Sequence, residues 1–283
     1  MTDFWSAVLE FAETTTARVG AQLLADFGKV QASQKDDGSL VTQADCWSDE
    51  EIRKAIASTF PTHGMLTEET SHVFNGEEWC WIVDPLDGTT NFARGIPLWG
   101  ISLGLLYHGT PIFGYVYLPP LGQSFHGFWY EPATAANLPE TPLPGAFLNH
   151  QPIHSSLDEP SKNHFFSLCA RSIAVLKQPF PAKIRMLGVA TYNLLSVATG
   201  AMLGGVEATP KIWDIAAIWA IAQAAGAVWV PLETNPIFPL EPGKNYGSRS
   251  FPTLVVSKPE LVATFLPLVH FIGKREQGIG NRE

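Results

Sequence analysis

Cysteine is scarce in this chain, which limits the kinds of site that it can build. Only three of the 283 residues are cysteines, and Cys46, Cys80 and Cys169 lie far apart, outside any CxxC or Cys/His cluster. A disulfide framework requires patterned pairs, and a structural zinc site requires Cys and His ligands at short spacings. The sequence therefore predicts three reduced thiols, without a disulfide scaffold or a zinc site.

Positive charge is also in short supply. The chain has 18 Lys and Arg against 27 Asp and Glu, which gives a formal net charge of −9. Nucleic acids and acidic membranes are bound through basic surfaces, so neither is an expected partner. The surplus of carboxylates is compatible with an enzyme that depends on a cation.

Long hydrophobic runs are absent as well. No apolar run approaches the roughly 20 residues that a membrane-spanning helix needs, and the opening MTDFWSAVLEFAE has neither the basic start nor the apolar core of a signal peptide. The cytoplasm is therefore the expected location. Hydrophobic residues still make up 46% of the chain, enough to bury a large core in one or two domains.

The order of hydrophobic patterns predicts helices and strands in alternating blocks. Apolar side chains at helical spacing predict a first helix over residues 4–27, and short aromatic and β-branched runs from residue 79 to 130 predict a sheet with hairpins. This arrangement favours an α+β or α/β layered fold over an all-β sandwich. Further helices are expected over 192–202, 214–226 and 261–272, and further strands over 40–41, 165–169, 228–232 and 253–257.

The start of the second helix has two candidates. Thr42 and Asp45 have the spacing of a capping box, and so do Ser48 and Glu51. Either start leads to a helix that ends near Phe60. The segment 131–156, rich in Pro, Ala and Asn, is expected to be an irregular excursion at the rim of a site, and 273–283 a frayed tail.

The segment WIVDPLDGTTNF, residues 81–92, is the most informative in the chain. Its apolar start predicts a short buried strand, and Pro85 is expected to end that strand. Asp84 would then lie at the strand end and Asp87 in the following turn. The backbone N–H groups of residues 88–90, at the start of a possible short helix, could bind an anion beside these hard oxygen ligands.

Taken alone, DPLDG is explained equally well as an ordinary turn, because Asp-Pro and Asp-Gly both favour turns. The full string DPLDGTTNF, however, resembles the signature of the inositol monophosphatase family, within the wider group of magnesium-dependent, lithium-sensitive sugar phosphatases. The resemblance covers nearly the whole chain. It implies an αβαβα layered sandwich, one unit over 1–283 with a metal-site half (1–145) and a substrate-side half (146–272), a homodimer, and about two or three magnesium ions per site.

Two further motifs extend the resemblance to distant carboxylates. Glu68 in MLTEET resembles the first Glu of the family's GEES-like element, although an acidic pair is usually a solvated surface feature. Asp214 is the second residue of WDIAAIWAIAQAAG, which resembles the family's second signature, although an Asp there also suits a helix N-terminus. The metal ligands that the resemblance implies are Glu68, Asp84, the backbone carbonyl of Leu86, Asp87 and Asp214.

The residues expected to activate water are Glu68, Thr89 and Asp45. Lys35, Ser39 and Asp45 correspond in order to the family's KxxxDLVTxxD region, with Ser39 in place of a carboxylate. The match implies that Asp45 cooperates with Thr89, although Asp45 could equally support the first turn of the second helix.

For the substrate, the turn Gly188, Val189 and Ala190 resembles the family's GSA or GTA turn. Val189 stands where a hydroxyl residue is usual, so backbone contacts would survive and a side-chain hydrogen bond would not. Glu207 lies seven residues before Asp214, the spacing at which the family places a Glu that reaches substrate hydroxyls. The expected substrate-binding set is Leu86, Asp87, Gly88, Thr89, Gly188, Val189, Ala190, Glu207 and Asp214.

These residues predict a phosphoric monoester hydrolase that uses an activated water on a small phosphorylated metabolite. Inositol monophosphate is the first expectation, because the Thr90-Asn91 continuation resembles that branch of the family. Histidinol phosphate and fructose 1,6-bisphosphate are the alternatives. A non-catalytic regulatory binding protein is the alternative of another class, but such a protein would have little need for the complete set of four carboxylates.

Overall fold

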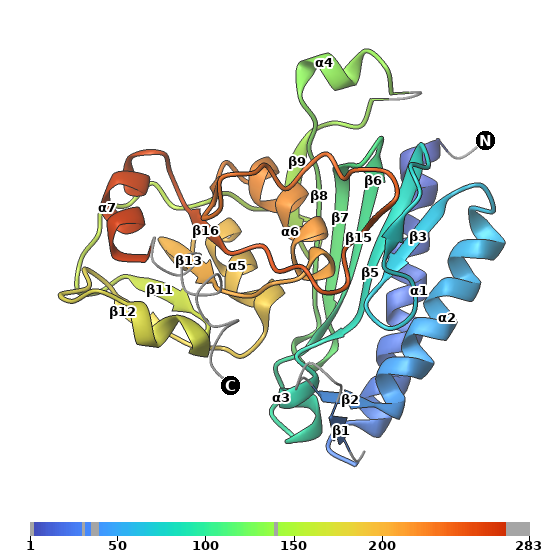
Figure 1. The fold of residues 1–283 in the computed structure, drawn as a ribbon, viewed down its shortest axis with the longest axis horizontal. Helices are drawn as coiled ribbons and strands as arrows, with labels where there is room; N and C mark the ends of the chain where they lie inside the picture. The colour runs from blue at the N-terminus through green and yellow to red at the C-terminus, as the bar shows by residue number, and fades with distance from the viewer. Residues whose placement is uncertain (1–2, 30–31, 35–39, 139–140, 270–283) are drawn as a thin grey trace.

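Helices and sheets alternate in five layers in the computed structural model, which describes residues 3–29, 32–34, 40–138 and 141–269 (Figure 1). Helices α1 (Phe4–Asp26) and α2 (Gln43–Thr59) cover one face of a large sheet, and α5 (Ala190–Ala198) and α6 (Ile212–Ala224) separate it from a smaller sheet. Helix α7 (Glu260–Val269) packs on the far face of the smaller sheet. The predicted αβαβα layering is therefore confirmed.

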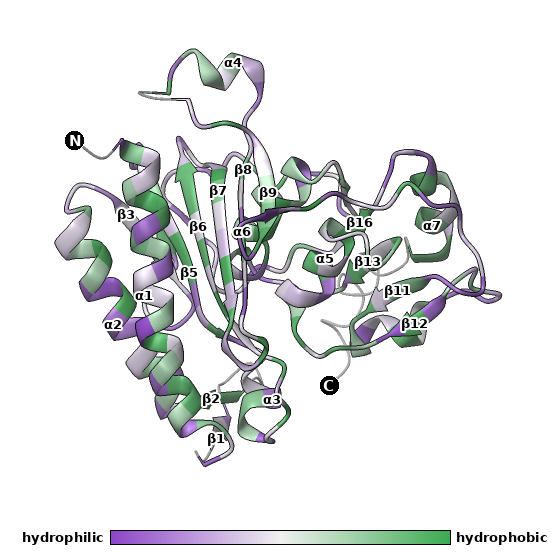
Figure 2. Ribbon diagram, turned by 180° about the vertical axis from the view of Figure 1, so that it is seen from behind, coloured by the Kyte–Doolittle hydropathy of each residue, from purple (hydrophilic) through white to green (hydrophobic). Residues whose placement is uncertain are grey.

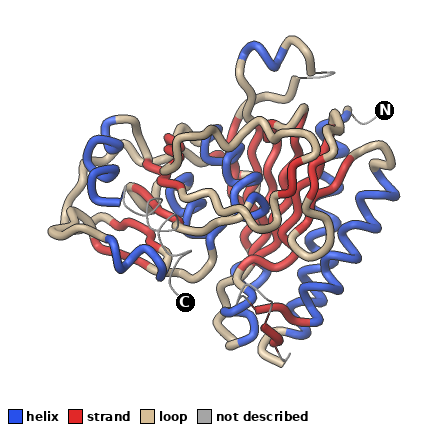
Figure 3. Tube along the Cα trace, in the orientation of Figure 1, coloured by secondary structure: helices blue, strands red, loops and turns tan. Residues whose placement is uncertain are grey.

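The large sheet, whose strands lie side by side in red in Figure 3, is mostly antiparallel. Its β3 edge is parallel to β5, and every other neighbouring pair in it is antiparallel, as the predicted hairpins require. In spatial order the strands are β10 (Gln151–Pro152), β9 (Gly145–Leu148), β8 (Gln123–Phe128), β7 (Thr110–Leu118), β6 (Gly100–Tyr107), β5 (Trp79–Asp87) and β3 (Gly64–Thr67).

The smaller sheet is mixed: three neighbouring strands are parallel, and the next strand, β16, is antiparallel to the neighbour on each of its sides. Its order is β12 (Lys183–Arg185), β11 (Phe165–Leu168), β13 (Gly204–Glu207), β16 (Thr253–Val256) and β14 (Val228–Pro231). The remaining elements are the pairs β1 (Ala32–Gln34) with β2 (Leu40–Thr42) and β4 (Val73–Phe74) with β15 (Lys244–Asn245), the short helices α3 (Thr89–Ala93) and α4 (Pro132–Ala135), and the 3-10 turns Pro119–Leu121 and Ala170–Val175.

A row of glycines allows α6 to lie close to the large sheet. Gly104, Gly114 and Gly127 are direct cross-strand partners on β6, β7 and β8. A Cβ atom at Gly114 would lie 2.0 Å from the carbonyl oxygen of Ala217 in α6. Any side chain there would push the helix away, and α6 carries Asp214 in its first turn. The glycine row thus helps to fix the distance between Asp214 and the acidic end of β5.

The outer helices α1 and α2 mix hydrophilic and hydrophobic residues, as helices with one solvent-facing side do (Figure 2).

The N-cap of α2 decides between the two candidate starts of this helix. Thr42 is the N-cap, and it forms a complete capping box with Asp45, so the alternative start at Ser48 and Glu51 is wrong.

The expectation that Pro85 ends the strand is also wrong. Strand β5 continues to Asp87, with Asp84 opposite Ser102 and Asp87 opposite Gly100 in β6. The register shifts between the two aspartates, so the irregularity accommodates a residue that cannot donate to the ladder. Both aspartates therefore belong to a rigid sheet and not to a free turn.

The segment 131–156 is more regular than its composition predicts. It holds α4, β9 and β10, and β9 pairs with β8 to extend the large sheet. Helix α4 projects from the end of the sheet opposite α3 (Figure 1). No described residue of 131–156 lines either of the two pockets beside Asp84, Asp87 and Asp214, so the expected place at the rim of the site is wrong. Four apolar-rich residues, GAFL, were enough to form β9 despite flanking Pro and Asn.

The other expected elements occur with small shifts. Helix α6 begins two residues before Asp214, and α5 spans Ala190–Ala198 where 192–202 was expected. None of the three cysteines, all of which lie in the described part of the chain, forms a disulfide, and no described helix has the length and apolarity needed to span a bilayer. Lys35, Ser39 and the tail 273–283 lie outside the described residues.

A candidate metal and phosphate site

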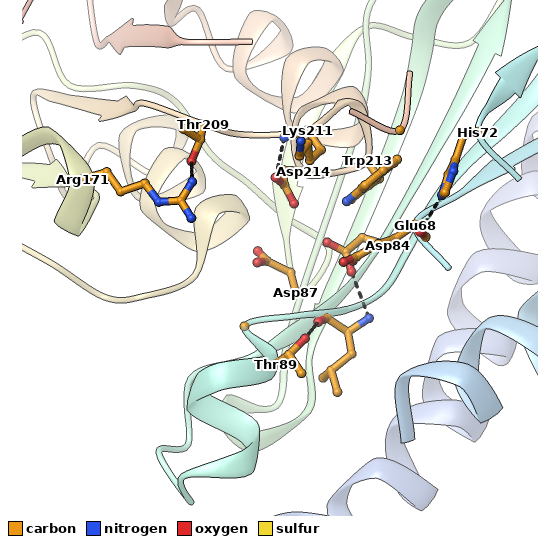
Figure 4. Close-up of a pocket in the computed structure, with 13 residues that line it drawn as sticks. Glu68, His72, Asp84, Asp87, Thr89, Arg171, Thr209, Lys211, Trp213 and Asp214 are labelled. Carbon is orange, nitrogen blue, oxygen red and sulfur yellow. Dashed lines mark hydrogen bonds between the residues drawn. The ribbon is translucent and has the colours of Figure 1, made fainter. Parts of the chain in front are cut away.

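Three carboxylates from two distant parts of the chain converge where the large sheet meets α6. Asp84, Asp87 and Asp214, called here the acidic triad, each place an oxygen within 4.8 Å of the others. Two of them come from β5 and the third from the first turn of α6. Figure 4 shows the three carboxylates facing a common space. The sequence-predicted aspartates are therefore brought together.

Asp84 lies at the buried end of the acidic triad and is only 1% exposed. Its Oδ1 accepts a 3.0 Å hydrogen bond from the backbone N–H of Leu86, which turns the carboxylate along the bulged strand. Burial raises the pKa of Asp84 well above its usual value, and the charges of Glu68, Asp87 and Asp214 raise it further. The charged form of Asp84 is thus unfavourable until a cation compensates it.

Asp214 occupies the first turn of α6, two residues after the start of the helix. Its Oδ2 accepts a 2.7 Å hydrogen bond from the backbone N–H of Lys211, so it also satisfies a donor at the helix start. Although the side chain is partly exposed to the pocket, the surrounding protein raises its pKa well above the usual value, and so do the charges of Asp87 and Glu68. Asp214 therefore both accepts a hydrogen bond at the start of α6 and presents its carboxylate to the pocket.

Asp87 is held by Thr191, a residue at the start of α5. Its Oδ2 accepts hydrogen bonds from the backbone N–H of Thr191 at 2.8 Å and from the hydroxyl of Thr191 at 2.5 Å. Burial raises the pKa of Asp87, while the hydrogen bonds from Thr191 act in the opposite direction. Sequence reasoning missed Thr191, although a polar residue that follows the Gly188–Ala190 turn was a visible signal.

Glu68 lies beside the acidic triad, just after β3. Its backbone N–H donates to the carbonyl of Val83 at 3.1 Å, which fastens it to β5, and its carbonyl accepts from Nε2 of His72 at 2.8 Å. Its charge raises the pKa values of both Asp84 and Asp214. Glu68 is therefore close enough to join the site, and Figure 4 shows its side chain next to Asp84.

Asp45 reaches the site through Thr89. The Thr89 hydroxyl donates to Oδ1 of Asp45 at 2.8 Å, with the carbonyl of Leu86 as a second acceptor at 3.1 Å. The other oxygen of Asp45 accepts from the backbone N–H and the hydroxyl of Thr42. The two roles left open by the sequence, support of the helix and cooperation with Thr89, are both compatible with this geometry.

The start of α3 and the start of α5 meet at Gly88. Gly88 has a φ of 92° and is the N-cap of α3, and a Cβ atom there would lie 3.0 Å from Val189 and 3.2 Å from the carbonyl oxygen of Leu98. Asn91 donates through Nδ2 to the carbonyls of Leu98 and Leu187, both at 2.9 Å. The predicted phosphate and substrate turns are thus adjacent, and Asn91 is a supporting residue that the sequence reasoning did not assign.

Glu207 is buried at the end of β13 and not on a solvated loop. It is 5% exposed, and its Oε1 accepts a 2.6 Å hydrogen bond from Nδ2 of Asn193. Burial raises its pKa to about 8, assisted by the charges of Asp87 and Asp214. Asn193, one turn into α5, is a further supporting residue that sequence reasoning missed.

Two adjoining pockets of about 440 and 480 Å³ open onto these groups. Both are lined by Arg171 and Thr209, whose side chains share a 2.8 Å hydrogen bond, and Lys211 lines the first. The second also contains Glu207 and the turn Gly188–Ala190. The acidic floor therefore carries basic groups at its margin, where an anionic substrate could be held.

The donor set of the acidic triad fits a hard divalent cation. Carboxylate and carbonyl oxygens are the ligands that Mg²⁺ prefers, and the described oxygens lie within the span of one such site. Besides burial, the negative charges of neighbouring carboxylates raise the pKa values of Asp84 and Asp214. A bound cation would neutralise that negative charge.

Comparison with known proteins agrees with this geometry. A family model described as inositol monophosphatase family matches residues 5–263. A fructose-1,6-bisphosphatase/inositol-1-monophosphatase of Aquifex aeolicus is 32% identical over 78% of this chain and 84% of its own length. A histidinol-phosphatase of Chlorobaculum parvum is 29% identical over 80% and 85%, respectively. The structure of a Thermotoga maritima IMPase superposes with a TM-score of 0.76, at 25% identity, over 96% of this chain and 99% of that one.

Proposed function

The chain belongs to the inositol monophosphatase family of phosphoric monoester hydrolases, and from that premise we propose that it hydrolyses inositol monophosphate with the help of magnesium. The observation that carries the proposal is the convergence of three carboxylate oxygens within 4.8 Å beside a pocket with basic margins. Family membership supports action on small phosphorylated metabolites, and the choice of inositol monophosphate and of magnesium is the proposed refinement.

In this proposal the metal is held by the acidic triad, Glu68 and the backbone carbonyl of Leu86. When bound, magnesium would lower the pKa of the attacking water and offset the charge that develops on the departing oxygen. The protein contributes a preorganised set of oxygens, because β5 packs into hydrophobic clusters on both of its faces and the first turn of α6 packs into one of them. Little reorganisation would then be needed during the reaction.

Thr89 and Asp45 are the proposed path for the proton of the attacking water. The Thr89 hydroxyl donates to Asp45, so its oxygen can accept a proton from water while its own proton moves toward the carboxylate. Glu68, on the other side of the acidic triad, is the second proposed acceptor. Both arrangements place a base close to the metal-binding oxygens.

The proposed phosphate contacts are the backbone N–H groups of Gly88 and Thr89. The substrate alcohol would then extend into the second pocket, along the turn Gly188–Ala190 toward Glu207. Because the Glu207 carboxyl has a pKa of about 8, it can donate or accept a hydrogen bond near neutral pH. That property suits a polyol, whose hydroxyl groups can do both.

Histidinol phosphate is the second candidate, because the same buried Glu207 could pair with a substrate ammonium group. An ammonium ion would favour the charged carboxylate and lower its pKa on binding. The resemblance to a histidinol-phosphatase at 29% identity gives this candidate additional weight.

The test is a phosphate-release assay with and without Mg²⁺ on four esters: inositol 1-phosphate, histidinol phosphate, fructose 1,6-bisphosphate and adenosine 3′,5′-bisphosphate. We expect Mg²⁺-dependent turnover with the highest kcat/KM for inositol 1-phosphate. A preference for another ester would replace the proposed substrate. Absence of turnover with all four, in protein that binds the metal, would favour a regulatory binding protein.

A further inference from the structure

Thr191 contacts the acidic triad from outside the two pockets. Both its backbone N–H and its hydroxyl donate to Asp87, and both contacts go to the same oxygen, Oδ2. Thr191 is fully buried and lines neither of the two pockets. Its hydroxyl is therefore placed to act on a carboxylate and not on a ligand.

The contact with Asp87 also caps the N-terminus of α5. The N-cap residue, Val189, makes no side-chain capping hydrogen bond, so the N–H of Thr191 would lack the usual side-chain acceptor. Asp87, 104 residues earlier in the chain, supplies that acceptor. One carboxylate thus caps a helix of the substrate-side half while standing in the acidic triad of the metal-site half.

The two donors fix the orientation of Asp87. A carboxylate that holds a single hydrogen bond can still rotate about its terminal bond, whereas two donors 2.8 and 2.5 Å from one oxygen restrict that rotation. Oδ1, which Thr191 does not contact, is then held in one place. Neither Val189 nor Ala190 carries a hydroxyl. Thr191 is therefore the first residue after Gly188 whose side chain can supply the second donor.

We infer that Thr191 is a positioning residue for the metal site, and that its hydroxyl orients Asp87 for binding a divalent cation. The inference rests on the proposed metal-dependent function. Partners that hold metal ligands in place typically account for about 10-fold to 100-fold in metal affinity. Because the backbone N–H remains when the hydroxyl is removed, the lower end of that range is expected.

The test compares Mn²⁺ binding by Thr191→Val, Thr191→Ser and Thr199→Val with the wild type, using electron paramagnetic resonance of free Mn²⁺ in metal-depleted protein. Thr191→Val keeps the shape but loses the donor, and Thr191→Ser restores it. Thr199→Val is the matched control, since the Thr199 hydroxyl binds the carbonyl of Ser196 at the other end of the same helix. Thermal unfolding of each variant is recorded alongside.

We expect Thr191→Val to weaken Mn²⁺ binding about 10-fold and to raise the Mg²⁺ concentration for half-maximal turnover by a similar factor. Thr191→Ser should stay within about two-fold of the wild type, and Thr199→Val should match it. Wild-type affinity in Thr191→Val, or equal weakening in Thr199→Val, would overturn the inference. If Thr191→Val does not fold, Thr191→Ala decides by the same criterion.

The binding measurement separates this inference from the proposed function. A wild-type protein that binds Mn²⁺ but hydrolyses none of the four esters would contradict the proposed function, while the Thr191 comparison would still be decided by Mn²⁺ affinity. An active wild type with unchanged Mn²⁺ binding in Thr191→Val would contradict only the role of Thr191.

Discussion

The hydroxyl of Thr89 donates a 2.8 Å hydrogen bond to Oδ1 of Asp45, which lies 44 residues earlier in the chain. The other oxygen of Asp45 accepts from the backbone N–H of Thr42 and completes the capping box of α2. One buried carboxylate therefore belongs both to the start of a helix and to the reaction path that we propose. Its two oxygens separate the two roles, so variants can test them independently.

Thr89→Val should lower kcat for inositol 1-phosphate by roughly 10²-fold to 10⁴-fold, the usual contribution of a positioned proton acceptor, with little change in melting temperature. Thr89→Ser keeps the hydroxyl and should recover most of the rate. Thr42→Ala tests the other oxygen, and it should cost about 1 kcal/mol of stability while kcat falls less than about ten-fold. Equal loss of kcat in Thr42→Ala would contradict a separate role for Thr89.

Asp84→Asn should abolish turnover yet stabilise the metal-free fold. Burial and the neighbouring carboxylates raise the folded-state pKa of Asp84 above its unfolded value, so its contribution to stability falls as pH rises above about 4. The melting temperature of Asp84→Asn minus that of the wild type, measured in EDTA, should therefore increase with pH. Saturating Mg²⁺ should reduce or reverse the difference, because only the wild type keeps the full ligand set.

The control for Asp84→Asn is Asp158→Asn, which changes an exposed carboxylate. Its difference from the wild type should be small and should not grow as Asp84→Asn does. A difference for Asp84→Asn that is flat with pH would show that the charge of Asp84 is not opposed in the folded protein.

Alternating blocks of helices and strands could be predicted from signals that are local in the sequence, whereas the αβαβα layering and the role of the acidic triad followed from the family resemblance. The period of α1, the capping box at Thr42 and the short runs that became β6 to β8 each follow from neighbouring residues. The WD string placed Asp214 near a helix start, although the helix begins two residues earlier. The Asp84–Asp87 corner was recognised, but its sheet continues through Pro85 by a bulge that no local rule requires.

The residues that sequence reasoning missed act through contacts between distant segments. Thr191 and Asn91 bind partners about 100 residues away, and neither carries a charge that would draw attention to it. Glu207 was placed near the substrate, but its burial, which sets its pKa, depends on the packing of β13 against α5. A single sequence does not show which distant elements pack together, so these contacts and the burial of Glu207 could not be predicted from it.

Gly114→Ala should be strongly destabilising, because the added methyl would lie 2.0 Å from the backbone carbonyl of Ala217. Backbone cannot swing aside as a side chain can, so α6 would have to move, at a cost of about 1–3 kcal/mol or more. Gly145→Ala in strand β9 is the matched control, since its methyl would meet only the ring of Phe147 at 3.2 Å. Urea unfolding would measure both.

Displacement of α6 should also carry Asp214 away from β5. The folded fraction of Gly114→Ala should therefore need more Mg²⁺ for half-maximal turnover than Gly145→Ala does. Equal stability and equal Mg²⁺ dependence in the two variants would mean that the glycine row does not set the position of α6.

Glu207→Gln should stabilise the metal-free protein, by an amount that grows from about pH 4.5 to pH 8 and then levels off. The Glu207 carboxyl has a pKa of about 8 in the folded state and an ordinary value when unfolded, so the folded state holds an extra proton in that window. Stability conferred by that proton declines as pH rises, by at most about 1.4 kcal/mol per pH unit. Glutamine remains neutral and keeps an acceptor for Asn193.

The measurement is the melting temperature of Glu207→Gln minus that of the wild type in EDTA from pH 5 to pH 9, with exposed Glu131→Gln as control. Bound Mg²⁺ should shift the levelling point to lower pH, because Asp87 and Asp214 contribute to the raised pKa and the cation would neutralise them. A difference that levels off near pH 5 would mean that Glu207 is ionised in the folded protein at neutral pH. The dual hydrogen-bonding role proposed for it toward a polyol would then be lost, and an ammonium-bearing substrate would become the better fit.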